Sequence, residues 1–313
     1  MKRRLLLTLL SWTILPALEA QYFVIYDTNE FDRVVTLSSK LGKLAGDMRF
    51  VEGPVWVPRE GGYLIFSDIP ANELKKWSVK EDDVVTFRQP SNHANGNCLD
   101  ARGRLITAEH SGRRLSITER NGKVRTLIDQ FEGKKLNSPN DVVVKSDGTV
   151  WFTDPDYGLG NNPKEQAGNF VFRFDPRKKA LRPVARDFDK PNGLCFSPDE
   201  KKLYVADSGK PKHIRVFDVL PDGSLAGGDV FCQIDRGAPD GIRCDAEGRL
   251  YSSGGDGVYV FAPNGRLVGK IMVPESPANL AFGGRDGRTL FITARTSLYG
   301  IRLAVKGARL ASR

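Results

Sequence analysis

Six side chains that carry an oxygen recur along the sequence, each at the start of a short apolar run. Successive members are 39 to 52 residues apart. We call them the anchor residues: Glu52, Asn95, Asn140, Asn192, Asp240 and Asn279. Carboxylate and amide oxygens are the ligands that Ca²⁺ prefers, in sets of about six to eight that include water. If the anchors converge, the carboxylates of Glu52 and Asp240 would neutralise one divalent ion.

Such a site has a definite chemistry. A bound divalent ion acts as a Lewis acid on a carbonyl or phosphoryl oxygen. A carboxylate beside it activates water as a general base. The pattern therefore indicates hydrolysis at a single metal site.

The alternative interpretation is that each anchor is an ordinary turn residue, since Asn-Gly and Asp-Gly are common turn dipeptides. It fits any one anchor well but fits the set poorly. Glu52 is not a turn former, Asn279 is not followed by Gly, and Asn140 is followed by Asp. What the six share is an oxygen, which favours a common site.

The elements that would position the anchors form an internal repeat. Each anchor begins an apolar strand, which a polar turn, usually containing Gly, links to a second strand. Further strand pairs follow in most repeats, such as 115–118 with 124–127 and 258–261 with 267–270. Four short strands per repeat of roughly 45 residues are typical of a propeller blade. The sequence predicts an all-β, six-bladed β-propeller with four antiparallel strands per blade.

This architecture explains why the anchors would meet. The innermost strand of every blade runs along the central channel in the same direction, so all six anchors face one mouth. The last repeat is short, and we expect Arg33–Leu37 to supply its fourth strand, which closes the ring and removes exposed sheet edges. Residues 21–313 then form one domain.

The first twenty residues have the layout of a secretory signal peptide. Three basic residues precede an apolar stretch from Leu5 to Leu18, and Ala20 is a small residue at the expected cleavage site. The alternative is an uncleaved anchor, but the stretch is shorter than the roughly 20 residues of a spanning helix. We expect cleavage, a secreted or periplasmic product, and no stable membrane insertion afterwards.

Charge and cysteine content exclude other classes. The net charge is +9, but Lys and Arg are scattered over turns, so we expect no nucleic-acid partner. Cys98 and Cys195 lie in apolar strands and are expected to be buried thiols. Cys232 and Cys244 are close enough in sequence to pair in an oxidising compartment. No C-x-x-C occurs and only three His are present, which argues against a Cys/His zinc site.

Several motifs together resemble the SMP-30/gluconolactonase/LRE-like (regucalcin-like) family, particularly its bacterial gluconolactonases. The resemblance covers residues 45–300, with the motifs in order: Glu52-Gly-Pro-Val-Trp, Asn137-Ser-Pro-Asn-Asp, Trp151-Phe-Thr-Asp-Pro, Pro191-Asn-Gly-Leu and Pro239-Asp-Gly. It implies a six-bladed propeller with one catalytic divalent cation, commonly Ca²⁺ and sometimes Zn²⁺ or Mg²⁺. It also implies hydrolysis of a small sugar lactone to the aldonic acid.

The resemblance also implies roles for individual residues. The metal ligands would be Glu52, Asn192 and Asp240, with Asp240 as the base, and Asn140 would lie near metal and substrate. Some animal members carry an Arg two residues before this Asn for substrate contact. Here that position is Ser138, so substrate preference does not carry over.

The remaining candidates are substrate contacts. Asn95 and Asn279 are expected to line the channel or contact substrate. His110 ends the second strand of its blade, either at the rim of the site or in a surface turn. Tyr157 opens a polar loop that runs to Ala167, either a lid or a blade connection. Two other functions are compatible with the pattern: phosphotriester hydrolysis at the same metal site, and a binding propeller with a structural ion.

Overall fold

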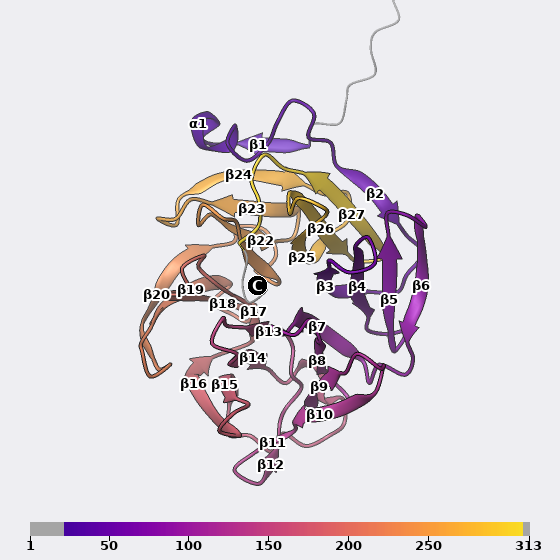
Figure 1. The fold of residues 1–313 in the computed structure, drawn as a ribbon. Coiled ribbons are helices and arrows are strands. Elements are labelled where there is room, and N and C mark those ends of the chain that lie inside the picture. Colours follow the sequence, from indigo (N-terminus) through magenta and orange to yellow (C-terminus); the bar gives the residue numbers. More distant parts are fainter. Residues whose placement is uncertain (1–21, 309–313) are drawn as a thin grey trace, which may run out of the picture.

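A computed structural model describes residues 22–308, which fold into a ring of six antiparallel sheets around a central channel (Figure 1). The predicted signal peptide, residues 1–20, lies outside the described residues. Within 22–308 no helix is long and apolar enough to cross a membrane. The predicted six-bladed propeller is confirmed.

Each blade is built on four strands, with the first strand innermost. These strands follow one another in the chain in blades 1 to 5, whereas the fourth strand of blade 6 comes from the N-terminal part of the chain. The strands of blades 1 to 3 are β3 (Val51–Val57), β4 (Tyr63–Asp68), β5 (Glu73–Ser78), β6 (Asp83–Arg88); β7 (Ala94–Leu99), β8 (Leu105–Glu109), β9 (Arg114–Thr118), β10 (Val124–Ile128); and β13 (Val142–Val144), β14 (Val150–Asp154), β15 (Asn169–Asp175), β16 (Ala180–Phe188). Those of blades 4 to 6 are β17 (Pro191–Phe196), β18 (Lys202–Asp207), β19 (His213–Val219), β20 (Leu225–Gln233); β21 (Ile242–Cys244), β22 (Leu250–Ser253), β23 (Gly257–Phe261), β24 (Leu267–Met272); and β25 (Pro277–Gly283), β26 (Thr289–Ala294), β27 (Ser297–Arg302).

The hydrophobic core lies between neighbouring blades, because the sheets pack face to face. Trp151 of blade 3 meets Phe196 of blade 4 edge to face, with ring centres 5.4 Å apart. Trp56 of blade 1 stacks on Phe291 of blade 6 at 5.3 Å. Aromatic pairs of this kind add to the free energy of area burial. They hold the blades in register around the channel.

Ring closure uses a different segment from the predicted one. The fourth strand of blade 6 is β2 (Gly42–Ala45), which pairs with β27, and not Arg33–Leu37. The latter segment follows helix α1 (Thr28–Phe31) as a turn that buries Val34, whose carbonyl accepts a hydrogen bond of 2.8 Å from Ala304 N. Burial of Val34 on a turn thus outweighs its strand propensity.

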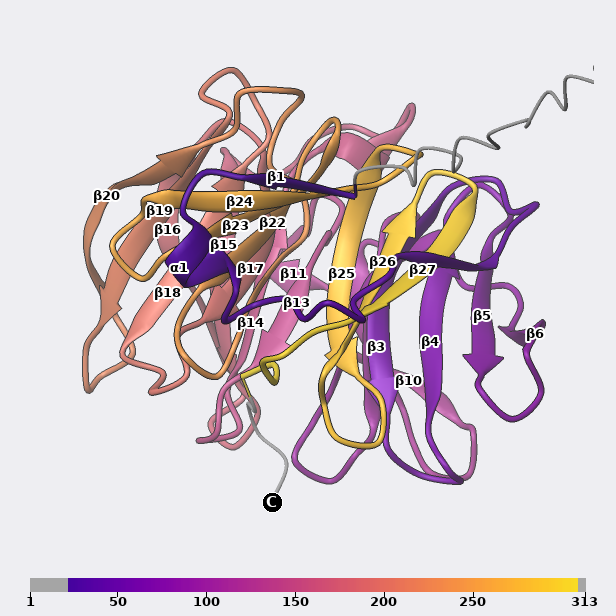
Figure 2. The same ribbon diagram turned by 90° about the horizontal axis from the view of Figure 1, so that it is seen from above.

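Blade 5 gains a fifth strand that the repeat did not predict. Strand β1 (Phe23–Ile25) pairs with the outer strand β24. It lies along the rim of the ring with α1, as Figure 2 shows, and covers a sheet edge. The N-terminal part of the described chain therefore joins two neighbouring blades, 5 and 6.

Two smaller elements interrupt the regular pattern. The hairpin β11 (Gln130–Phe131) and β12 (Lys134–Lys135) connects blades 2 and 3. A 3₁₀ helix, η1 (Tyr157–Leu159), lies in the loop between β14 and β15. This loop is the predicted lid or blade connection.

All four cysteines of the described chain are free thiols. The nearest thiol to Cys244 in this set is Cys195, with a distance of 3.8 Å between the sulfur atoms. Cys232 belongs to the same buried cluster but is not bonded to Cys244. The proposed pairing of Cys232 with Cys244 is thus absent from the structure, since inner strands of adjacent blades place Cys195 beside Cys244 instead.

Candidate active site at the channel mouth

Local irregularities of the inner strands position the anchors. Register shifts follow or span the anchors at Glu52/Val55 in β3, Ala94/Asn97 in β7, Pro191/Leu194 in β17 and Pro277/Asn279 in β25. A β-bulge of this kind re-aims a side chain and is common beside active sites. The anchors therefore belong to the inner strands or the residues that lead into them.

The glycines that follow four anchors have a packing role. A Cβ atom on Gly53, Gly96 or Gly193 would overlap the main-chain oxygen of the anchor in the next blade, and one on Gly241 would overlap the Asn279 side chain. The alternative interpretation of these dipeptides as ordinary turns is therefore wrong. Glycine is required here because successive blades approach each other backbone to backbone.

Hydrogen bonds between blades fix the anchor main chains. Gly96 N donates to Asn140 O at 2.7 Å, and Gly193 N donates to Asp240 O at 3.1 Å. The hydroxyl of Thr153, on a second strand, donates to Asn192 O at 2.7 Å. Asn140, Asn192 and Asp240 are thus each held by the preceding blade, which ties blades 2 to 5 together at the mouth of the channel.

The two anchor carboxylates interact at this mouth. Glu52 is buried, and its Oε2 accepts a hydrogen bond of 2.9 Å from Asn279 Nδ2. Burial, followed by the charges of Asp240 and Asp141, raises the pKa of Glu52 well above its usual value. Burial and the charge of Asp141 raise the pKa of Asp240 to about 7, against a hydrogen bond with Asn192. This concentration of negative charge would be relieved by a cation.

Two buried amide oxygens at the mouth lack a hydrogen-bond donor in the described chain, and a cation would give them a partner. Oδ1 of Asn192 and Oδ1 of Asn95 are buried and have no hydrogen-bond donor within residues 22–308. An unpaired buried oxygen is costly, and a cation is one partner that would satisfy it. Asn192 also contacts Asp240, which in turn interacts with Glu52. Glu52, Asn192 and Asp240 are thus brought together as predicted, and their oxygens fit a hard divalent ion.

The described chain holds no group of three or more His, Cys, Asp or Glu arranged for a metal. The predicted set has only two carboxylates, and its other members are amides. Asn140 is buried in the same ring, and its main chain bonds to Gly96 and Thr153. The amide nitrogen of Asn279 donates to Glu52, so Asn279 lines the channel as the hydrogen-bond partner of that carboxylate.

His110 is not a surface-turn histidine. It is 8% exposed, and its Nε2 lies 3.1 Å from Nδ2 of Asn95. Burial, with a smaller effect of His93, lowers the pKa of His110 to about 4, so the ring is neutral. A neutral ring accepts the Asn95 amide hydrogen at Nε2. His110 thereby leaves the Asn95 oxygen as the free end of that side chain.

The loop with Tyr157 reaches the mouth. Burial, with a smaller effect of the charge of Asp240, raises the pKa of Tyr157 to about 12, against hydrogen bonds with Ser208 and Asn192 that lower it. Ser138 holds this loop: its hydroxyl donates to Pro155 O at 2.6 Å and accepts from Gly158 N at 2.8 Å. Ser138, which stands where some animal relatives have an Arg, is therefore fully buried in this chain and holds the loop in place.

Sequence analysis missed two charged residues in the channel. Asp141 is fully buried, and its Oδ2 lies 3.1 Å from Nη1 of Arg243 in β21. Two irregularities of the repeat mark them. Asp141 occupies the position that holds Gly after four of the other anchors, and Arg243 interrupts an apolar inner strand between Ile242 and Cys244.

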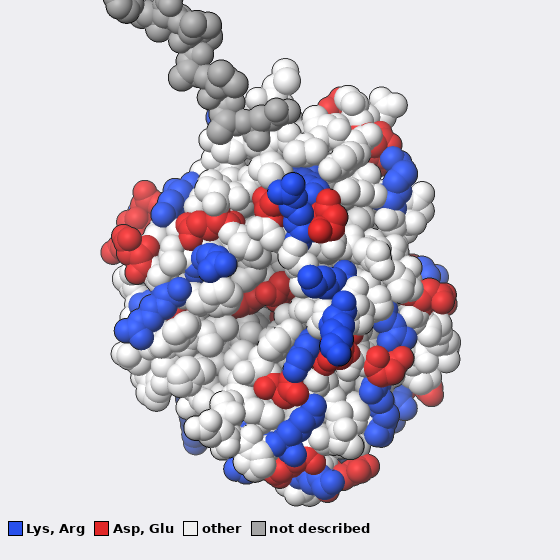
Figure 3. Space-filling model, turned by 180° about the vertical axis from the view of Figure 1, so that it is seen from behind, with Lys and Arg blue, Asp and Glu red and all other residues white. Residues whose placement is uncertain are grey.

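The charge of the surface follows this arrangement. On the face seen in Figure 3, acidic side chains lie in a central hollow, and Lys and Arg side chains surround it. An acidic hollow at the centre repels nucleic-acid phosphates and attracts cations. On this face the Lys and Arg side chains lie around the hollow and not within it.

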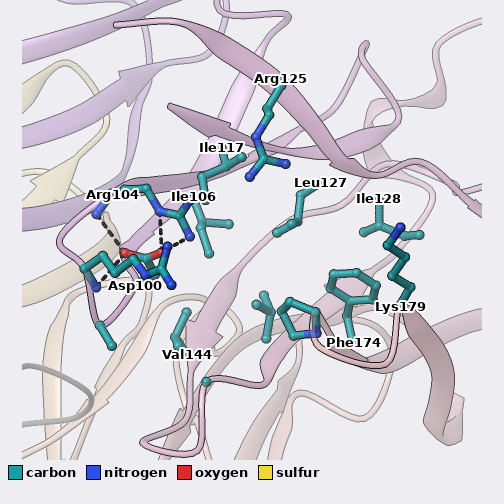
Figure 4. Close-up of a pocket in the computed structure, with 15 residues that line it drawn as sticks. Asp100, Arg104, Ile106, Ile117, Arg125, Leu127, Ile128, Val144, Phe174 and Lys179 are labelled. Carbon is teal, nitrogen blue, oxygen red and sulfur yellow. Dashed lines mark hydrogen bonds and ion pairs between the residues drawn. The ribbon is translucent and has the colours of Figure 1, made fainter. Parts of the chain in front are cut away.

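A separate cavity of about 640 Å³ lies between blades 2 and 3 (Figure 4). Its floor is apolar, and Arg104 and Arg125 at its rim are paired: Arg104 lies 2.7 Å from Asp100, and both Arg104 and Arg125 contact Glu119. Its lining contains no anchor residue. The hydrolytic chemistry predicted from the anchors therefore belongs to the channel mouth.

Comparison with known proteins agrees with this fold. The chain is 34% identical over 304 residues to a gluconolactonase of Zymomonas mobilis, covering 88% of this chain and 85% of that protein. A Xanthomonas campestris gluconolactonase structure matches with a TM-score of 0.85 and 33% identity, over 91% and 96% of the two chains. The fold also matches a calcium-binding regucalcin from Agrobacterium tumefaciens (TM-score 0.73, 21% identity, 86% and 97% covered). Residues 50–296 match the family model described as the SMP-30/Gluconolactonase/LRE-like region, and the chain belongs to this family.

Proposed function

We propose that this protein is a divalent-metal-dependent hydrolase that opens sugar lactones to aldonic acids. The observation that carries the proposal is the contact of Asn192 with Asp240 beside buried Glu52, which leaves Oδ1 of Asn192 unpaired. The gluconolactonases of Zymomonas and Xanthomonas support the substrate class.

Glu52, Asn192 and Asp240 would hold the ion, and Asn140 would complete the set. We propose Ca²⁺ as the resident ion because every donor is an oxygen, whereas Zn²⁺ favours nitrogen and sulfur. The nearest imidazole on this side, His110, already accepts from Asn95. The name of the Agrobacterium structure, a calcium-binding protein, agrees with this choice.

When bound, the ion supplies a Lewis acid for the carbonyl oxygen of the lactone. Asp240, the carboxylate that is partly exposed at the mouth, accepts a proton from the attacking water. The water oxygen bonds to the carbonyl carbon, the ring C–O bond breaks, and the ring oxygen takes up the proton that Asp240 accepted, which returns Asp240 to its carboxylate form. Glu52 keeps its carboxylate oriented through the hydrogen bond from Asn279.

Polar groups around the mouth suit a hydroxyl-rich substrate. Asn95 of blade 2, positioned by His110, offers its amide oxygen. Asn140 and the hydroxyl of Tyr157 belong to the adjacent blade 3. We assign these side chains to substrate binding. A neutral sugar lactone enters an acidic hollow without the repulsion that a phosphorylated compound would meet.

The test is acid release from glucono-1,5-lactone in an unbuffered assay, with and without chelator. We expect turnover above spontaneous hydrolysis that is lost with chelator, restored by Ca²⁺, and reduced at least about 1000-fold in Asp240→Asn. Asp218→Asn, at an exposed carboxylate, is the control. Equal rates for wild type and Asp240→Asn would exclude the mechanism. Faster turnover of a phosphotriester on the same preparation would favour the other hydrolase, and Ca²⁺ binding without turnover would favour a binding propeller.

We further propose that residues 1–20 direct the protein to the periplasm or the medium. The charge and apolar pattern of this segment support the proposal. Cell fractionation followed by N-terminal sequencing tests it. A mature protein that still begins at Met1, in the cytoplasm, would contradict it.

A further inference from the structure

An ion pair crosses the channel below the mouth, between the fully buried Asp141 and Arg243, whose side chain is 17% exposed. Asp141 precedes β13 in blade 3, and Arg243 lies in β21 of blade 5, 102 positions later in the sequence. Oδ2 of Asp141 lies 3.1 Å from Nη1 of Arg243, while Oδ1 accepts from Val142 N at 2.8 Å. Because blade 4 separates the two blades, the pair spans the channel.

The pair is electrostatically part of the site. The charge of Asp141 acts on both Glu52 and Asp240. Nη1 of Arg243 also donates to Ile242 O at 2.6 Å. The thiols of Cys98 and Cys195, on the inner strands of blades 2 and 4, are further groups that interact with Arg243. The described channel thus brings together three carboxylates and one guanidinium. With all of them ionised, the net charge is two negative.

A buried ion pair is weak support for stability, since an apolar pair of similar volume often serves as well. The other inner strands show that an acid is not needed to pack this position, because they hold Gly there after Glu52, Asn95, Asn192 and Asp240. A contribution to stability therefore does not explain why this pair lies directly below the proposed metal ligands.

We propose that Arg243 and Asp141 are positioning residues that set the charge of the mouth: Arg243 neutralises Asp141, so that Glu52 and Asp240 alone present the two negative charges that match a divalent cation. The inference rests on the proposed metal site. It differs from direct ligation, in which Asp141 itself would bind the ion.

Charge variants separate these roles. Asp141→Asn leaves the guanidinium of Arg243 unneutralised below the site, because arginine stays protonated at all relevant pH values. Ca²⁺ affinity should fall about ten-fold or more, as a unit charge within site dimensions requires. Removing that charge in Asp141→Asn/Arg243→Gln should restore the dissociation constant to within about three-fold of wild type, since the two changes are coupled. Arg243→Met replaces Arg243→Gln if the first double variant does not fold.

The readout is Ca²⁺ binding by titration calorimetry on chelator-treated full-length protein, with thermal unfolding in chelator as the check of folding. Asp245→Asn is the matched control, because Asp245 is also fully buried and paired, at 3.2 Å, with Arg249 away from the channel. It should lower the unfolding temperature and leave Ca²⁺ affinity unchanged.

Three outcomes would overturn the inference. Unchanged affinity in Asp141→Asn would show that the pair does not act on the site. A double variant as weak as Asp141→Asn would identify Asp141 as a ligand. If the wild type binds no Ca²⁺, the proposed metal site is wrong and the inference fails with it. This result differs from the first two, in which the wild type binds Ca²⁺.

Discussion

Nε2 of His110 lies 3.1 Å from the amide nitrogen of Asn95, and this contact fixes which end of Asn95 is free. The histidine is buried and neutral, so its role does not depend on carrying a charge at physiological pH. A second consequence concerns the pH dependence of stability.

We predict that His110 makes the protein less stable in mild acid. Its folded-state pKa of about 4 is below the usual value of 6.5, so between these values the unfolded chain binds a proton that the folded chain does not. The stabilisation is therefore complete above pH 6.5 and is lost as the pH falls towards 4. The full effect is at most about 3 kcal/mol.

Thermal unfolding in chelator at pH 7.5 and pH 4.5 measures this effect. His110→Gln keeps a hydrogen-bond acceptor without a titrating ring, and it should lose less stability across this interval than wild type does. His213→Gln, at a less buried histidine, is the control. An equal loss for wild type and His110→Gln would refute the prediction.

Asp240 should destabilise the metal-free fold near neutral pH. Its folded-state pKa, about 7, is above the usual 3.8, so between these values the folded protein binds more protons than the unfolded chain. Its contribution to stability is then greatest at low pH and is lost as the pH rises through 7. In chelator at pH 7.5, Asp240→Asn should unfold a few degrees above wild type.

Calcium should reverse this order, because it binds and stabilises the folded wild type and not the variant. The measurement is the unfolding temperature of both proteins with chelator and with millimolar Ca²⁺. If Asp240→Asn is less stable than wild type even in chelator, the carboxylate stabilises the empty site, contrary to the charge repulsion inferred here.

The glycine after an anchor should tolerate no side chain. Gly193 faces the main-chain oxygen of Asp240 so closely that a Cβ atom must separate blades 4 and 5. Gly193→Ala should cost roughly 1–3 kcal/mol or more of folding free energy and displace Asp240, lowering kcat/KM. Gly42→Ala in the closing strand, where a Cβ has room, should change neither quantity. Normal activity of Gly193→Ala would show that the blades are free to separate without harm to the site.

These glycines show where sequence analysis succeeds and where it stops. The repeat, the six inner strands and the contact of Asn192, Asp240 and Glu52 follow from spacing, because a propeller converts equal position in each repeat into proximity. The packing role of Gly193 and Gly241 does not follow from spacing, because glycine is favoured both in a turn and where two blades approach each other closely.

The remaining errors have the same origin. Arg33–Leu37 has strand-forming residues, but only the packed structure shows that Val34 is buried on a turn and that β2 closes the ring. Two contacts link residues that are far apart in the sequence. Cys195 lies beside Cys244, and Asp141 pairs with Arg243. Contacts across the channel depend on side-chain direction, which the repeat does not specify.

The thiols should be unreactive in the native protein. Burial raises the pKa of Cys98 and of Cys232, and Cys195 is buried against Cys244. A thiolate is the reactive species, so raised pKa and burial both slow its reaction. Ellman's reagent should detect no thiols within minutes in the folded protein and four after denaturation. Detection of only two after denaturation would show that Cys195 and Cys244 become oxidised to a disulfide.

Tyr157 should govern substrate affinity more than turnover. Its hydroxyl interacts with Ser208 and Asn192 at the mouth, while its ring is 45% exposed and packs near Lys190. Tyr157→Phe keeps the ring and removes the hydroxyl, so we expect KM for a sugar lactone to rise about three- to ten-fold with kcat little changed. Tyr26→Phe, at an exposed tyrosine that directly follows β1 on the outer strand of blade 5, should change neither constant. A fall in kcat at constant KM would instead place the Tyr157 hydroxyl in contact with the reacting atoms, because only an interaction made in the transition state lowers kcat without weakening substrate binding.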